Sequence, residues 1–425
     1  MRGLFGLAAA IIIIVFVSGC MQTGEKTAAE AEVKEVEIPV GVLVDLSGPL
    51  TTYGWDIKTA TTIAGEDVNK KFAEDGKPYR VKLYIEDTGA DPKKALDTVM
   101  ALQAKGVKLI VGPMSSGELK SVSEYSRSNK IILASPSSTA ETKYIGVTAP
   151  EEKKFIFRFV PTDSFQTKGI AELTHELGVK AVVITYTGNA WGKGLEEFGR
   201  EEFEKQGVEV KTSVEYPNPP PADFTPYIAT LEENVNTLLK DYSRDEIAVV
   251  VFSYEEVATM LAQTKDSSVL LDVKWVGCDG TAKSSKIIED VPEKASRIKL
   301  FSTVSETKGG EDFDKLNTTY YQQIGNSPQG YGLNSYDATW VLALSFAEVY
   351  DKEGKYNADA MAEAMPGMAE EYSMGNYGVY PVSGEVKFNE YRDRIGSRYI
   401  IYAVSDGNWN ANGVWEFATN RVEWS

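Results

Sequence analysis

Val40-Gly-Val-Leu-Val44, followed by Asp-Leu-Ser-Gly-Pro-Leu-Thr-Thr-Tyr53, is the stretch of sequence that decides the fold. The apolar residues have the composition of a buried β-strand, and the Ser-Gly-Pro segment after them is typical of a loop. Apolar side chains then recur every three or four positions from Ile57 to Phe72, which predicts a helix with one buried face. A buried strand that leads through a short loop into an amphipathic helix is the building unit of an α/β fold.

The same unit recurs along the chain. Asp91 and Pro92 are typical of a helix N-cap and first turn, and Asp223 with Pro226 predicts a second helix start with an acidic cap. Alternating strands and helices predict parallel sheets covered by helices on both faces, here as two doubly wound, Rossmann-like lobes. The predicted strands are 81–85, 108–111, 131–134, 181–185, 208–214, 247–252 and 273–276, and the predicted helices include 92–105, 194–205 and 255–263.

The regular alternation of predicted strands and helices ends after Phe301. Helical periodicity predicts helices at about 310–324, 335–351 and 357–365. Two apolar runs near the end, at 384–388 and 399–404, predict strands of a β-rich tail.

The first residues predict export. Arg2 precedes an apolar run from Leu4 to Val17, which is shorter than the roughly 20 residues of a membrane-spanning helix and has the size of a signal-peptide core. The run ends in Val17-Ser-Gly-Cys20, which resembles the lipobox of bacterial-type lipoproteins. By that resemblance, residues 1–19 are a signal peptide and Cys20 carries a diacylglycerol that anchors the protein to the outer face of the cytoplasmic membrane. The alternative is an ordinary secretory signal with an incidental cysteine.

Residues 20–37 have no aromatic side chain and predict a flexible tether. The rest of the 425-residue chain is long enough for two domains, and no later stretch is apolar for long enough to span a membrane. With 62 acidic and 44 basic residues, the net charge of −18 repels nucleic acid. Because Cys278 has no partner once Cys20 is lipidated, we expect no internal disulfide.

The sequence offers little for catalysis. Its single histidine, His175, lies in an amphipathic helix pattern, where a surface position is expected. Zinc-type cysteine clusters, phosphate loops and Gly-x-Ser-x-Gly elbows are absent from the sequence. We therefore expect a protein that is not an enzyme and needs no metal or cofactor.

Loops rich in Ser, Thr and Gly follow the predicted strands, at the place where doubly wound sheets bind ligands. Ser116 and Thr139 are each predicted to begin a helix, so that hydroxyls and helix N–H groups form a cradle for a carboxylate. The second block of strands offers aromatic side chains and one carboxylate, Asp279, which can pair with an ammonium group. The two together predict a site for a zwitterionic amino acid, although loops of this composition also serve simply to cap helices.

Several short motifs, in this order and spacing, resemble the branched-chain amino acid type of periplasmic-binding protein, the type I fold of ABC importers. The resemblance covers the chain from about Ile38 to about Trp409. The motifs that carry it are Ser47-Gly-Pro49, Tyr53-Gly54, Asp91-Pro92, Gly112-Pro-Met-Ser-Ser116, Ser135-Pro-Ser-Ser-Thr139, Trp191-Gly-Lys-Gly194, Asp223-Phe224 and Gly277-Cys-Asp-Gly280.

The resemblance implies a role for each matching residue. It implies that three hydroxyl residues bind the ligand carboxylate and part of its ammonium group, that Asp279 holds the ammonium, and that Tyr254 lies near the same end. It implies further that Trp191 closes over the ligand from the second lobe. The hydroxyl residues are Ser116, Ser137 and Thr139; Tyr53 and Tyr331 are implied to line the side-chain pocket, and Met114, in the Gly112–Ser116 motif, is counted among the binding residues.

The implied fold has three crossover segments between the lobes, near Val160, Thr303 and Lys387. Lobe 1 is then 38–160 plus 304–386, and lobe 2 is 161–303 plus 387–425. The implied function is a monomeric receptor that captures an amino acid, branched-chain or otherwise hydrophobic or aromatic, and delivers it to an ABC transporter permease. The alternatives are an extracytoplasmic sensor of amides, urea or aromatic carboxylates, and an exported enzyme.

Overall fold

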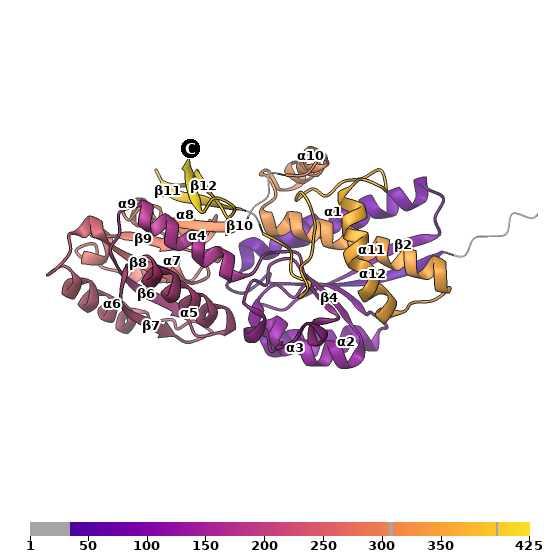
Figure 1. Ribbon diagram of the computed structural model, residues 1–425, viewed down its shortest axis with the longest axis horizontal. Helices are drawn as coiled ribbons and strands as arrows, with labels where there is room; N and C mark the ends of the chain where they lie inside the picture. Colours follow the sequence, from indigo (N-terminus) through magenta and orange to yellow (C-terminus); the bar gives the residue numbers. More distant parts are fainter. Residues whose placement is uncertain (1–34, 306–308, 397) are drawn as a thin grey trace, which may run out of the picture. The chain divides into compact units, whose positions relative to one another are not determined.

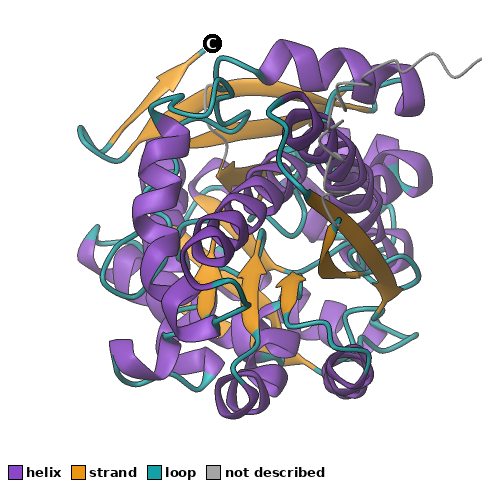
Figure 2. Ribbon diagram, turned by 90° about the vertical axis from the view of Figure 1, so that its right-hand side faces the viewer, coloured by secondary structure: helices purple, strands orange, loops and turns teal. Residues whose placement is uncertain are grey.

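The computed structural model describes residues 35–305, 309–396 and 398–425. The predicted signal peptide, Cys20 and the tether up to Lys34 lie outside these residues. Two β-sheets with helices on both sides form two lobes, as predicted (Figure 1, Figure 2). Over the same described ranges, no helix combines the length and the apolar composition that a membrane crossing requires.

The sheet of lobe 1 has five parallel strands in the order β2-β1-β3-β4-β5. Helices α2 and α3 cover one face of it, and α1, α11 and α12 cover the other (Figure 1). The strands are β1 (Val36–Val44), β2 (Tyr79–Asp87), β3 (Leu109–Val111), β4 (Ile132–Ser135) and β5 (Ile156–Arg158). The helices are α1 (Thr51–Glu74), α2 (Pro92–Ala104), α3 (Ser116–Asn129), α10 (Phe313–Ile324), α11 (Gly330–Glu353) and α12 (Ala358–Ser373).

The sheet of lobe 2 has eight strands in the order β13-β12-β11-β10-β9-β8-β6-β7. Strands β6 to β10 run parallel, and β11 to β13 extend the sheet antiparallel from β10. The strands are β6 (Ala181–Thr187), β7 (Glu209–Tyr216), β8 (Ile247–Phe252), β9 (Lys274–Gly277), β10 (Phe301–Ser305), β11 (Arg398–Ser405), β12 (Asn408–Glu416) and β13 (Arg421–Trp424). One face is covered by α4 (Asp163–Glu176) and α5 (Ala190–Lys205), the other by α6 (Thr225–Leu238), α7 (Val257–Gln263), α8 (Ser285–Asp290) and α9 (Pro292–Arg297).

One of the two helix caps predicted from the sequence is confirmed. Asp91 accepts hydrogen bonds from the backbone N–H groups of Lys93 and Lys94, which confirms it as the N-cap of α2. The cap predicted at Asp223 is displaced by one residue, because Phe224 is the N-cap while the Asp223 side chain accepts from the N–H of Thr225.

Two sequence predictions in the C-terminal part are wrong. Residues 384–388 form no strand: only Phe388 makes an isolated bridge, because the carbonyls of Ser383, Gly384 and Glu385 are taken by the guanidinium of Arg394. Helix α12 continues through Pro366 to Ser373 instead of ending at 365. Its buried apolar face outweighs the hydrogen bond that the proline removes.

The chain passes between the two lobes three times: between β5 and α4, between β10 and α10, and between α12 and β11. Asp393 and Arg394 still bond to lobe 1, where they contact Arg158 and Asn334. We therefore infer that the third crossing follows Arg394 rather than lying near Lys387.

Candidate functional site

Eight of the nine predicted binding residues line one small cavity at the carboxyl ends of the strands, between the lobes. Its volume is about 20 Å³, room for about one water molecule. Thr139 is the predicted residue that does not line it. The lining residues are Leu50, Tyr53, Met114, Ser115, Ser116, Ser137, Trp191, Tyr254, Asp279, Gly280 and Tyr331.

Hydroxyl groups join two loops of lobe 1, the one after β3 (residues 112–116) and the one after β4 (residues 136–140). Ser116 is the first residue of α3, and its Oγ lies 3.0 Å from Oγ of Ser138 and accepts a 3.1 Å bond from the N–H of Ala140. Ser137 Oγ donates to the carbonyl of Met114 at 3.0 Å. The lobe 1 wall is therefore neutral and rich in hydroxyl groups at the start of a helix, which suits an anionic group.

Thr139 does not begin a helix, contrary to the sequence prediction. Its carbonyl accepts the N–H of Asp163 at 2.8 Å, while its hydroxyl is buried without a hydrogen-bond partner of normal length. A short 3-10 helix starts only at Thr142. Residues 136–140 form a loop after β4, and the bond from Asp163 ties Thr139 in this loop to the start of α4 in lobe 2.

The lobe 2 wall is aromatic. Trp191, in the first turn of α5, stacks on Tyr254 with ring centroids 4.5 Å apart and an interplanar angle of 12°. Asn189, the N-cap of α5, donates from Nδ2 to the Tyr254 hydroxyl at 3.1 Å. A Cβ atom on Gly280 would lie 2.7 Å from the Trp191 ring, so glycine is needed there for the wall to close.

Asp279 is the charged group of the cavity. Tyr331 donates its hydroxyl proton to Oδ2 of Asp279, whereas Oδ1 is buried without a hydrogen-bond partner of normal length, and the side chain of Gln166 is a second donor near the carboxylate. Burial raises the pKa of this carboxyl to about 6. An unpartnered carboxylate oxygen in a buried site is the feature that a ligand ammonium group satisfies.

A second buried acid, Asp163, was not singled out from the sequence. It is the first residue of α4, and neither carboxyl oxygen has a hydrogen-bond partner of normal length, although the Thr139 side chain is a nearby donor. Burial, and then the charge of Asp279, raise its pKa well above the usual range. The signal that could have found it is its position in Pro161-Thr-Asp163, directly after the first crossing near Val160.

The two lobes also bond directly to each other. The hydroxyl of Tyr53 in α1 lies 2.7 Å from the carbonyl of Asp279 and 2.5 Å from that of Ala282, both of which can accept its proton. Next to it, the N–H of Thr52 donates to Oε1 of Glu255 at 3.2 Å. A ligand the size of an amino acid therefore enters only when the lobes or these side chains move apart.

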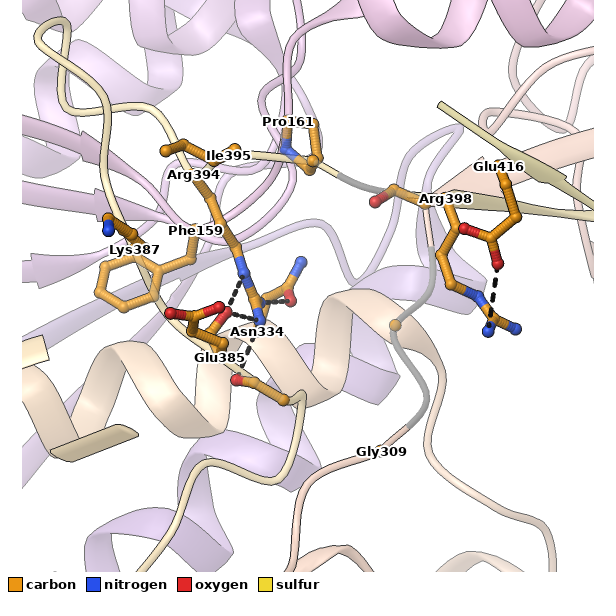
Figure 3. A pocket seen from close by; sticks show the side chains of 14 residues that line it. Phe159, Pro161, Gly309, Asn334, Glu385, Lys387, Arg394, Ile395, Arg398 and Glu416 are labelled. Carbon is orange, nitrogen blue, oxygen red and sulfur yellow. Dashed lines mark hydrogen bonds and ion pairs between the residues drawn. The ribbon is translucent and has the colours of Figure 1, made fainter. Parts of the chain in front are cut away.

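A larger cavity of about 460 Å³ lies at the crossings and contains no predicted binding residue (Figure 3). Arg394 is its most buried basic residue, and its guanidinium donates to Oδ1 of Asn334 at 2.9 Å and to Oγ of Ser383 at 2.7 Å. Asn334 in turn donates to the carbonyl of Pro136 at 3.1 Å. Through Asn334, Arg394 thus supports the loop after β4 (residues 136–140).

Residues 56–407 match the family model described as the receptor family ligand binding region. The chain belongs to this family. Its fold is that of the type I periplasmic binding proteins, which are solute-binding receptors.

Two relatives cover nearly the whole chain. An uncharacterized protein of Methanocaldococcus jannaschii is 42% identical over 411 residues, which are 96% of this chain and 97% of that protein. A Leu/Ile/Val-binding protein of Rhizobium johnstonii is 22% identical, over 89% of this chain and 95% of its own length.

Two solved structures share the fold. A leucine-binding protein, LivK, of Thermotoga maritima has a TM-score of 0.72 and 19% identity, and the alignment covers 90% of this chain and 99% of that one. The branched-chain amino acid transporter substrate-binding protein LivJ of Streptococcus pneumoniae, in complex with isoleucine, has a TM-score of 0.70 and 20% identity, covering 92% and 100%.

Proposed function

We propose that this chain is the substrate-binding protein of an ABC importer and that its ligand is an amino acid with an apolar side chain. The observation that carries the proposal is the buried carboxylate of Asp279, whose Oδ1 has no hydrogen-bond partner of normal length and which lines the same cavity as a neutral, hydroxyl-rich wall on the other lobe. One end of the site suits NH₃⁺ and the other suits COO⁻. The names of the Leu/Ile/Val-binding relatives support an aliphatic ligand.

In this proposal the aromatic residues of both lobes hold the apolar side chain. Trp191 and Tyr254 approach from lobe 2, and Tyr53 and Tyr331 approach from lobe 1. The ligand contacts both lobes, so its binding energy favours the closed arrangement over the open one. We propose further that a permease receives the ligand, and that the protein works outside the cytoplasm on a lipid anchor at Cys20.

The test is a thermal-shift screen of the purified protein against amino acids, amides and aromatic acids, followed by calorimetry on the hits. A tight ligand raises the melting temperature through linkage. Asp279→Asn should weaken amino-acid binding by at least roughly 30-fold, since leaving a buried ammonium without its charged partner costs about 2 kcal/mol or more.

The control is Asp245→Asn, the same change at a fully exposed carboxylate, which should leave affinity unchanged. Equal affinity of D279N and the wild type for amino acids would reject the ammonium site. Binding of aromatic acids or amides in place of amino acids would favour the sensor alternative. Mass spectrometry of the mature protein tests the anchor: an N-terminus other than a lipid-modified Cys20 contradicts it.

A further inference from the structure

Tyr331 and Asp279 belong to different lobes, yet they share a hydrogen bond at the centre of the candidate site. Tyr331 lies in the first turn of α11 in lobe 1, and Asp279 follows β9 in lobe 2. We propose that Tyr331 is a positioning residue that completes the ammonium site when the lobes close: its hydroxyl holds Oδ2 of Asp279 and so orients the carboxylate for the ligand. This proposal rests on the proposed function and adds to it how closure is coupled to recognition.

The start of α11 is held rigidly, so the Tyr331 hydroxyl has a defined position. The buried carboxylate of Asp56 accepts the N–H of Gln329 at 3.0 Å, the N–H of Gly332 at 2.7 Å and the hydroxyl of Tyr320 at 2.7 Å. A Cβ atom on Gly332 would lie 2.5 Å from that carboxylate. The helix turn that carries Tyr331 therefore has little freedom to retreat from Asp279.

Because Asp279 is buried, the Tyr331 hydroxyl has a large effect on the pKa of its carboxyl. Burial raises the pKa of the carboxyl, and the Tyr331 hydrogen bond is the strongest effect that lowers it. In the open form Tyr331 moves away with lobe 1, so the carboxylate loses that donor. The titratable groups around Asp279 are Asp163 in α4, Cys278 beside it, Tyr53 in α1, Tyr254 after β8, Tyr331 in α11 and Tyr399 in β11.

Tyr53 provides a matched control. Its ring centroid lies 4.9 Å from that of Tyr331, and its hydroxyl also crosses between the lobes. It donates to the backbone carbonyls of Asp279 and Ala282, which have no charge to stabilise. Removing either hydroxyl deletes hydrogen bonding between the lobes, but only the Tyr331 bond acts on the carboxylate.

The experiment follows the carboxyl titration of Asp279 by carbon-13 NMR in the full-length protein labelled at aspartate. The Asp279→Asn spectrum identifies the resonance. In Tyr331→Phe the midpoint should rise by about one pH unit, the shift expected when a hydrogen bond to a charged group is lost. In Tyr53→Phe it should stay at the wild-type value. Titrations are run without ligand and in the complex with any amino acid that the screen identifies.

Equal midpoints for the wild type and Y331F under every condition would overturn the proposal, and so would equal shifts in Y331F and Y53F. A shift seen only in the complex supports it, because closure then brings Tyr331 to Asp279. For an amino acid ligand, Y331F should weaken binding by about tenfold at pH 8. If no amino acid binds the wild type, the proposed function fails while the NMR result still decides the role of Tyr331.

Discussion

Glu118 offers a test of how this fold tolerates a buried acid. It lies in the first turn of α3, where Oε2 accepts the N–H of Ser115 at 2.9 Å and its hydroxyl at 2.8 Å, while Oε1 is buried without a partner of normal length and Thr88 is a further donor near the carboxyl. Burial raises the pKa of this carboxyl from 4.5 to about 7. The folded protein therefore holds a proton that the unfolded chain releases between these two pH values.

The contribution of Glu118 to the free energy of unfolding falls as pH rises. Because the pKa in the folded state lies above that in the unfolded state, the contribution of Glu118 is fully present below about pH 4.5 and is lost as pH rises through 7. At 1.36 kcal/mol per pH unit, the shift from 4.5 to about 7 corresponds to roughly 3 kcal/mol of destabilisation at pH 8. Glutamine at this position keeps the capping acceptor and carries no charge.

Glu118→Gln should match the wild type in free energy of unfolding at pH 4.5 and exceed it by roughly 2–3 kcal/mol at pH 8. Urea denaturation at several pH values measures both quantities. Glu124→Gln, the same change at an exposed position of α3, should leave the pH dependence unaltered. A Glu118→Gln protein that is less stable than the wild type at pH 8 would refute the reasoning, because Glu118 would then be ionised and well satisfied.

Two further predictions concern other buried groups. Asp393 binds the two fully buried cations Lys153 and Arg158, so Asp393→Asn should lower the free energy of unfolding by about 3–5 kcal/mol; a loss below 1 kcal/mol in denaturant titrations would show that the cations find other partners. A Cβ atom on Gly54 would lie 1.6 Å from the carbonyl oxygen of Asp45, so Gly54→Ala should prevent normal folding. Gly367→Ala in α12, where nothing lies within 4 Å, should instead raise the melting temperature through a gain of about 0.5–1 kcal/mol; similar thermal stability of the two variants would contradict this account.

The repeating pattern predicted the parallel cores well because those strands are buried on both faces. Ile247–Phe252, for example, has the bounds that its apolar run predicts. Strand β5, only Ile156–Arg158, is too short for any periodicity to register, and β12 and β13 are half-exposed with mixed composition. The pairing of β12 and β13 depends on β11 lying beside β10, a long-range contact that local sequence does not encode.

The site was predicted better than its internal bonds. Strand-end loops bring Ser116, Ser137 and Asp279 together because parallel strands end at one edge. The hydroxyl of Tyr331 on Asp279 could not be predicted, because it depends on how far one lobe rotates onto the other. The burial of Asp163 could not be predicted for a related reason, because it arises only where a crossing segment meets both lobes.

Both lobes are assembled from distant parts of the chain. Lobe 1 is completed only by α10 to α12, and the sheet of lobe 2 only by β11 to β13. These last strands include the fully buried Trp415, which packs on Gly169. A ribosome that has released only the first three hundred residues has made neither core in full. Neither lobe can therefore complete its hydrophobic core until nearly the whole chain has been synthesised.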